Sequence, residues 1–153
     1  MRPVTTCQPL SPRVFVDADV LFAGSASPSQ HGASLVVLRM AEITLINAYT
    51  SQQVIGEARR NLAKKIPKAL PTFEVLVSRC LTIVTNPSRG DLAAYHGLAD
   101  VSDLPVLVAA LRSECPWLVS FNTKHYMPGH PAVKVLPPGD FLLRIRSILA
   151  GLS

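Results

Sequence analysis

Short runs of β-branched and aromatic residues alternate with helix-like segments along this chain, and that alternation restricts the folds open to it. Arg13–Val16 has the composition of a central strand, and Trp117–Ser120 is a second run of the same kind. Further strands are expected at Thr44–Ala48, Leu81–Thr85 and Val133–Leu136. Such alternation is typical of a mainly parallel sheet flanked by helices. The 153 residues show no inter-domain linker, so we expect one three-layer α/β domain.

The segments between these strands carry helix signals. Ser51 is a suitable N-cap for a helix whose apolar stripe continues to Ile66 and which Pro67 ends. Gly24–Gln30 is small and polar, so we expect it to be a loop. The other expected helices are His31–Met40, Pro71–Arg79, Asp91–Leu98, Leu104–Glu114 and Asp140–Leu149.

The two ends of the chain differ in composition. Residues 1–12 are expected to form a flexible leader, because Pro3, Pro9 and Pro12 block regular structure. The globular domain is therefore expected to span residues 13–150.

Cysteine usage and hydropathy exclude several protein classes. Cys7, Cys80 and Cys115 are odd in number and have no C-x-x-C spacing, which argues against a disulfide framework and a structural zinc site. We expect Cys80 and Cys115 to be small apolar core fillers. Apolar runs are too short to span a bilayer and no secretory signal is evident, so a cytoplasmic protein without a membrane partner is the default expectation.

The charge balance favours a polyanionic partner. Fifteen Lys and Arg against ten Asp and Glu give a formal charge of +5. If several acids cluster in one pocket, the rest of the surface is more basic still, and nucleic acid is the obvious partner. Arg59, Arg60, Lys64 and Lys124 are candidates for phosphate contacts, with ordinary solvated surface charge as the alternative for each.

Oxygen-bearing side chains occur where the chain is expected to leave its sheet. Asp17 and Asn122 follow two of the expected strands, Glu57 lies beside the apolar stripe of its helix, and Asp103 precedes the helix Leu104–Glu114. Open α/β sheets bind ligands beyond the carboxyl ends of their strands, so these side chains are expected to converge. Such ligands suit a hard divalent cation, Mg²⁺ or Mn²⁺.

Each of these residues also has an ordinary structural explanation. Asp17 and Asn122 suit turns, Asp103 suits a helix N-cap, and Glu57 suits a solvated helix surface. Asp19 adds a carboxylate that repels Asp17 unless a cation or hydrogen-bond donors neutralise the pair. The joint order of strand end, helix, helix start and strand end favours one shared site.

These segments resemble the PIN domain, a metal-dependent nuclease fold often found as the toxin of bacterial toxin–antitoxin pairs. Val14–Ala23 resembles the family's opening strand, and Ser51–Glu57 resembles its second-acid helix. Asp100–Ala110 resembles the family's D-x-x-D-x-P-V-L-x-A-A segment. Leu118–Asn122 resembles the strand with the fourth polar site, and the resemblance covers about residues 13–145.

Two positions depart from the family's pattern. Asn122 stands where many members have Asp, and His125 stands at a position that is often acidic. Because Asn is neutral, the choice between one and two bound metals stays open. We expect His125 to be a surface loop residue.

The resemblance implies an endoribonuclease that requires Mg²⁺ or Mn²⁺. It implies that Asp17, Glu57 and Asp103 ligate one or two ions, partly through water, with Asp100 as a further ligand. Asn122 would complete the catalytic set, with supporting roles for Asp19 and Ser120. The resemblance also implies an RNA substrate, a possible antitoxin partner and a homodimer.

Two other functions fit parts of the sequence. Val14–Leu21 also resembles the opening motif of haloacid-dehalogenase-type phosphatases, in which Asp17 would be the nucleophile and Asp19 the general acid. That family needs a late acidic pair, and past Asn122 the chain offers only Asp140. The non-enzyme alternative is an inactive PIN-like module that binds RNA or protein, with which a neutral Asn122 is compatible.

Overall fold

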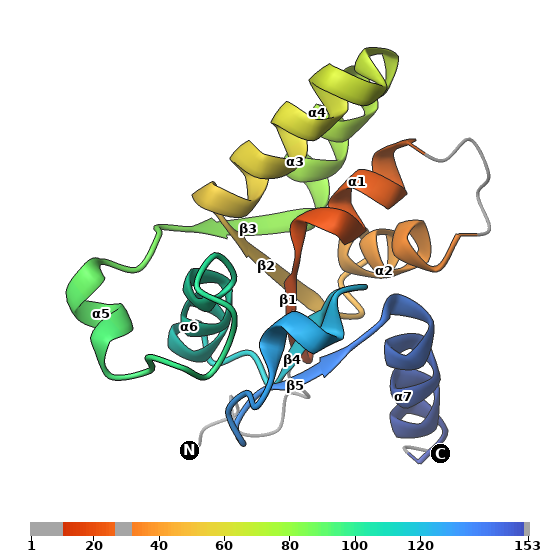
Figure 1. Ribbon diagram of the computed structural model, residues 1–153. Helices are drawn as coiled ribbons and strands as arrows, with labels where there is room; N and C mark the ends of the chain where they lie inside the picture. Colours follow the sequence, from red (N-terminus) through yellow and green to blue (C-terminus); the bar gives the residue numbers. More distant parts are fainter. Residues whose placement is uncertain (1–10, 27–31, 152–153) are drawn as a thin grey trace, which may run out of the picture.

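A single parallel sheet organises the molecule, as seen in a computed structural model that describes residues 11–26 and 32–151 (Figure 1). The sheet has five strands in the order β3-β2-β1-β4-β5, and every neighbouring pair is parallel. The strands are β1 (Arg13–Val16), β2 (Asn47–Ser51), β3 (Leu81–Val84), β4 (Trp117–Val119) and β5 (Lys134–Leu136). The predicted parallel α/β architecture is confirmed.

Helices cover both faces of the sheet. Helices α1 to α4 pack against one another and α7 packs against α2, whereas α5 packs against α6, which contacts β2 and β4. In Figure 1 α5 and α6 lie to the left of β1, and α2 and α7 lie to its right. The helices are α1 (Ala18–Ala26), α2 (Ala33–Glu42), α3 (Gln52–Lys65), α4 (Leu70–Cys80), α5 (Arg89–Ala93), α6 (Leu104–Arg112) and α7 (Pro138–Ala150), with 3₁₀ turns η2 (Pro67–Ala69) and η3 (Thr123–Tyr126).

The central strand β1 is apolar because helices cover both of its faces. Val14, Phe15 and Val16 are all fully buried, and burial of a side chain such as Phe15 contributes about 1.5–3 kcal/mol. Phe15 pairs in register with Tyr49 on one side and Leu118 on the other. This packing fixes the point at which the chain leaves the sheet.

The second strand begins at Asn47, so the predicted start at Thr44 was wrong. Thr44 has a left-handed φ of 64°, and the backbone N–H of Leu45 donates to the carbonyl of Met40 at 2.9 Å. These two residues close the turn after α2. The β-branched run therefore starts inside that turn.

The loop predicted for Gly24–Gln30 was also wrong at its start, because α1 continues through Ala26. Gly24 permits a close approach of α1 to α2: a Cβ at this position would lie 2.8 Å from Cδ1 of Leu38. Residues 27–31, which include the rest of the predicted loop and the first residue of the next predicted helix, lie outside the described residues.

Local caps account for other shifts in helix boundaries. The helix predicted at Asp91–Leu98 is the shorter α5, which starts earlier because Ser88 and Asp91 form a capping box. The Ser88 hydroxyl accepts the Asp91 N–H at 3.2 Å, and the Asp91 carboxylate accepts the Ser88 N–H at 2.8 Å. α6 ends at Arg112, two residues before Glu114, which has a left-handed φ of 57°.

Both described cysteines are free and belong to the core, as predicted. Burial raises the pKa of Cys80 to about 11 and that of Cys115 to about 12, so both stay protonated thiols. Cys7 and residues 1–10 of the predicted leader lie outside the described residues. Within the described ranges, no helix combines the length and apolarity needed to cross a membrane.

Candidate metal centre

Asp17 lies at the carboxyl end of β1, where it is 7% exposed. Its backbone N–H donates to the carbonyl of Val119 at 3.1 Å, which ties it to the end of β4. Its carboxylate accepts the backbone N–H of Ala18 at 2.8 Å and the hydroxyl of Ser120 at 2.8 Å. The side chain is therefore held in one orientation.

A third donor to Asp17 is Tyr126, a residue that sequence reasoning missed. Its phenol donates to the Asp17 carboxylate at 2.6 Å, and the Tyr126 side chain is 2% exposed. Burial and the neighbouring charge of Asp17 raise the pKa of Tyr126, so it stays a protonated donor. No local pattern around Tyr126 marks this role, because the contact spans 109 residues of the chain.

Asp19 lies in the first turn of α1, beside Asp17. One of its oxygens accepts the backbone N–H of Phe121 at 3.1 Å and the side-chain amide of Asn122 at 3.0 Å. Its other oxygen is buried and has no hydrogen-bond partner in the described part of the chain. Burial, together with the charge of Asp17, raises the pKa of Asp19 to about 6.

Glu57 belongs to α3, and Asp103 directly precedes α6. Glu57 is exposed, but partial desolvation by its neighbours raises its pKa, and the charges of Asp17 and Asp103 raise that pKa further. Burial and the charge of Asp17 likewise raise the pKa of Asp103. These three carboxylates thus lie close enough to repel one another. Asp103 is the N-cap residue of α6, but its side chain makes no capping hydrogen bond.

Asp100 and His125 extend the cluster at its exposed edge. The Asp103 carboxylate lies 3.1 Å from Nδ1 of His125, and the backbone N–H of Asp100 donates to the His125 carbonyl at 2.8 Å. Ligand atoms of these three residues all lie within 4.8 Å of one another. His125 is exposed, as predicted, but it also contacts a candidate ligand.

The donor set of this cluster fits a hard divalent cation. Five of the ten acidic residues in the chain gather here, and within residues 11–26 and 32–151 none of the five forms an ion pair with Lys or Arg. The unpartnered oxygen of Asp19 and the raised pKa values of Asp19, Glu57 and Asp103 both indicate that positive charge is lacking. Carboxylate and amide oxygens are the ligands that Mg²⁺ and Mn²⁺ prefer.

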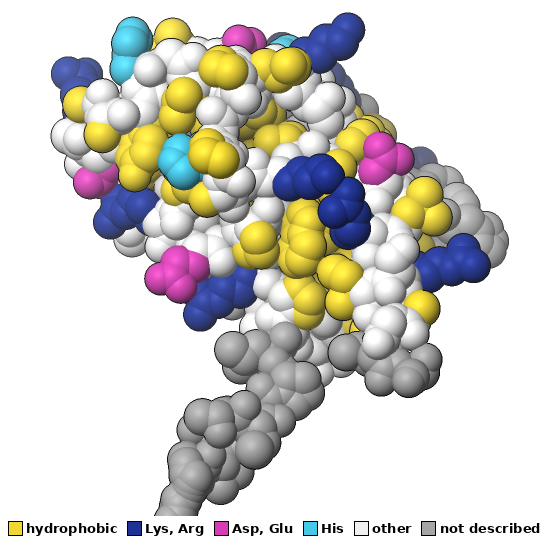
Figure 2. Space-filling view, turned by 90° about the horizontal axis from the view of Figure 1, so that it is seen from below, with side chains coloured by type: hydrophobic (Ala, Val, Ile, Leu, Met, Phe, Trp, Pro, Cys, Tyr) yellow, Lys and Arg dark blue, Asp and Glu magenta, His cyan; other side chains and the backbone are white. Residues whose placement is uncertain are grey.

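The basic residues predicted to contact RNA differ in their surroundings. Arg59 forms two hydrogen bonds with Glu74, at 2.8 and 2.9 Å, so it already has an intramolecular partner. The charge of Arg60 offsets part of the rise in the pKa of Glu57, whereas Lys64 and Lys124 are exposed. Figure 2 views the end of the molecule at which β1 begins, and there Lys and Arg are interspersed with hydrophobic side chains.

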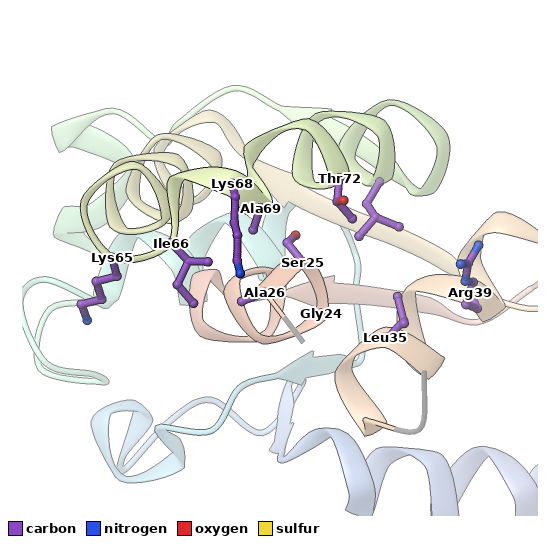
Figure 3. A pocket seen from close by; sticks show the side chains of 11 residues that line it. Gly24, Ser25, Ala26, Leu35, Arg39, Lys65, Ile66, Lys68, Ala69 and Thr72 are labelled. Carbon is purple, nitrogen blue, oxygen red and sulfur yellow. The ribbon is translucent and has the colours of Figure 1, made fainter. Parts of the chain in front are cut away.

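A cavity of about 770 Å³ has no residue of the acidic cluster in its lining (Figure 3). It is formed by the C-terminal ends of α1 and α3, the first part of α2, and η2 with α4. The charged residues among those lining it are Arg39, Lys65 and Lys68, and no acidic residue is among them. This cavity therefore lacks the ligands for a divalent cation.

Comparison with known proteins gives a family match and a set of similar folds. The family model of the PIN domain matches residues 13–124. The crystal structure of PAE2754 from Pyrobaculum aerophilum is 16% identical and has a TM-score of 0.63, covering 92% of this chain and 99% of that one. A search of curated proteins found no significant match.

Two further solved structures have the same identity of 16%. The crystal structure of VapBC2 from Rickettsia felis, bound to a DNA fragment from the VapBC2 promoter, has a TM-score of 0.58 and covers 80% of this chain and 96% of that one. VapC20 from Mycobacterium tuberculosis, a sarcin–ricin loop cleaving toxin, has a TM-score of 0.50, covering 69% of this chain and 86% of that one. At this identity the likeness shows a shared fold.

Proposed function

Because the chain belongs to the PIN domain family, we propose that it is an endoribonuclease that hydrolyses RNA phosphodiester bonds with Mg²⁺ or Mn²⁺. The observation that carries this proposal is that acids from elements far apart in the sequence act on one another: the charges of Asp17 and Asp103 help to raise the pKa of Glu57, and ligand atoms of Asp103 and Asp100 lie within 4.8 Å of each other. Carboxylates that repel one another in a half-buried cluster are stabilised by a bound cation.

Four carboxylates would hold the cation in this proposal: Asp17, Glu57, Asp100 and Asp103. When bound, a divalent cation supplies Lewis acidity and lowers the pKa of water near the scissile phosphate. Ser120 and Tyr126 orient Asp17 by donating to its carboxylate. Without a cation the cluster repels a phosphate, so metal-free protein is expected to be inert.

Asn122 has a different role in this proposal. Its side-chain amide donates to Asp19 at 3.0 Å, and its backbone N–H donates to the Ser120 hydroxyl at 3.1 Å. The neutral amide therefore balances part of the charge of Asp19 without adding a carboxylate. We infer that this lowers the affinity for a second cation.

Cations around the cluster would bind phosphates that flank the cleavage site. We propose Arg60, Lys64 and Lys124 for this role and leave out Arg59, because Glu74 already holds it. Binding through such contacts weakens as salt rises. A binding isotherm whose Kd does not change between low and high salt would contradict this assignment.

We also propose that the chain is the toxin of a toxin–antitoxin pair and that it forms a homodimer. The fold shared with the toxin VapC20 and with VapBC2 supports the first of these two proposals. Growth arrest on expression of the wild type, relieved by a neighbouring gene product, would test the first part. Light scattering on the purified protein would test the second, and a monomer mass at micromolar concentration would contradict it.

The experiment that tests the nuclease proposal is a cleavage assay on varied RNAs with Mn²⁺ or Mg²⁺. Asp17→Asn and Asp103→Asn should each lower the rate by at least about 100-fold, because each removes a ligand charge. EDTA should abolish cleavage. Asp140→Asn is the matched control, since it makes the same chemical change at an exposed acid on α7.

Other outcomes would support different functions. RNA binding that is indifferent to Mn²⁺ and to Asp17→Asn, without cleavage, would support an inactive binding module. The haloacid-dehalogenase alternative is disfavoured by the PIN domain match over residues 13–124. Turnover of p-nitrophenyl phosphate through a phosphorylated Asp17 would reverse that judgement.

A further inference from the structure

A second cavity, of about 470 Å³, is lined in part by residues that adjoin acids of the cluster in the chain. Val101 and Leu104 line this cavity, whereas Asp100 and Asp103 in the same segment face the cluster. Val101 directly follows Asp100 and Leu104 directly follows Asp103, so the Cα atom of each lining residue is about 3.8 Å from that of an acid in the cluster. The complete lining is Arg89, Leu92, Ala93, His96, Gly97, Ala99, Val101 and Leu104.

The walls of this cavity are apolar and its charged groups are basic. Val101 is 84% exposed, which is unusual for an apolar side chain beside buried Leu104. Arg89 and His96 are the ionisable residues among those lining the cavity, and no acidic residue lines it. Asp91, on the same short helix α5, is already paired with Arg112 at 2.6 Å. The cavity thus suits a ligand with a flat apolar group that fits between the walls and an attached anionic group that reaches the basic residues.

We propose that this cavity receives one unstacked nucleobase of the RNA, next to the scissile phosphate. The inference rests on the nuclease function proposed above and adds how the substrate is bound. The volume of the cavity lies within the range of about 300–1,000 Å³ that is typical of ligand pockets. The base contacts Val101 and the apolar floor, while Arg89 binds the adjoining phosphate.

A restriction on the substrate follows from this arrangement. A base can enter the cavity only after it leaves the helical stack, so the nucleotide must lie in a loop, a bulge or a single strand. Because apolar walls accept any base face, the site favours unpaired RNA more than a particular sequence. Fully paired RNA of the same sequence should be a poor substrate.

The test compares a short single-stranded RNA with versions that lack one base at a time around the mapped cut. Removal of the base that occupies the cavity should raise KM about tenfold, while removal of more distant bases should have little effect. Val101→Ser should raise KM for the intact RNA by a similar factor and should abolish the difference between intact and abasic RNA. Val101→Ile keeps an apolar wall and should preserve that difference.

Two controls separate this role from general charge and from metal binding. Arg89→Ala should raise KM, whereas Arg146→Ala removes the same charge from an exposed position on α7, on the opposite side of the molecule from α5, and should not (Figure 1). Mn²⁺ affinity, measured by calorimetry, should be unchanged in Val101→Ser, although the residue adjoins Asp100.

The outcomes distinguish the two proposals. Metal-dependent cleavage that tolerates an abasic residue at every position would overturn the cavity inference and leave the nuclease intact. If no RNA is cleaved, the nuclease proposal fails. Fluorescence anisotropy with Asp17→Asn protein then decides the cavity inference: equal Kd values for intact and abasic RNAs would overturn it, and weaker binding of one abasic RNA would support it.

Discussion

At the scale of single residues, Asp19 makes the metal-free protein sensitive to pH. Its folded-state pKa of about 6 lies above the usual value near 3.9, so the native state binds a proton more tightly than the unfolded chain does. The resulting stability is fully present below about pH 4 and is lost as pH rises through about 6. Glu57 and Asp103 shift in the same direction. In EDTA, the contribution of this cluster to the free energy of unfolding should therefore fall as pH rises from about 4 to about 6. Urea titrations at each pH measure it.

Asp19→Asn provides the comparison for this prediction. The amide keeps the shape of the side chain but cannot ionise, so the variant should lose less stability than the wild type between pH 4 and pH 7. The difference should be on the order of 1 kcal/mol, because the site is only partly buried and water screens it. Identical pH dependence in the two proteins would show that Asp19 ionises freely in the fold.

The sequence revealed some residues of the cluster and concealed others, for a physical reason. Asp17, Glu57 and Asp103 were predicted to converge because each stands at the end of, or on, an element that the sequence marks. Tyr126 was missed because its hydrogen bond to Asp17 depends on how η3 packs against β5. His125 was expected to be a surface residue, and its contact with Asp103 depends on the same packing.

At the scale of elements, the N-cap of α3 positions Glu57. The Ser51 hydroxyl accepts the backbone N–H of Val54 at 3.3 Å, and Ser51 is 2% exposed. Ser51→Ala should lower the free energy of unfolding by about 1 kcal/mol, because it leaves a helix donor unpaired. Urea denaturation measures this loss. Ser78→Ala is the control, since it makes the same change at an exposed position in α4, and an equal effect in both variants would exclude a capping role.

Elements with a one-sided apolar pattern were predictable, and those without it were not. For α3, the apolar stripe and the N-cap Ser51 were both predicted from the sequence, and both agree with the structure. α1 was missed because the face opposite its buried residues also carries apolar side chains, Phe22, Ala23 and Ala26, so its sequence shows no one-sided stripe. The start of β2 was predicted too early because Thr44 has a high β-propensity, although in the structure it adopts a left-handed turn conformation.

At the scale of the whole molecule, charge is divided between one acidic cluster and a basic remainder. Five acids form the candidate metal centre, and of the other five, Glu42, Glu74 and Asp91 form ion pairs with Arg. Because five acids lie in the cluster, the rest of the chain carries a larger formal positive charge than the net +5. Such a distribution attracts a polyanion to the surface outside the cluster. It repels the polyanion at the cluster itself until a cation has bound there.

The division of charge predicts that divalent cations stabilise the entire fold. A ligand present at 100 times its Kd adds about 2.7 kcal/mol to the free energy of unfolding. For a chain of this length that should raise Tm by about 5–10 °C. The rise with Mn²⁺ should be larger at pH 7.5 than at pH 5, because protons compete for the same carboxylates. Thermal melts at matched ionic strength measure it, with NaCl as the salt control.

Two variants decide whether the cluster is responsible for that rise in Tm. Asp103→Asn should reduce it, because Asp103 interacts with Asp17, Asp100 and His125 at the centre of the cluster. Asp140→Asn, on α7, should leave it unchanged. If both variants respond to Mn²⁺ as the wild type does, the cation binds elsewhere on the molecule. Asp17 and Asp19, beyond the carboxyl end of β1, would then be balanced by bound protons and by the donors from Ser120, Asn122 and Tyr126.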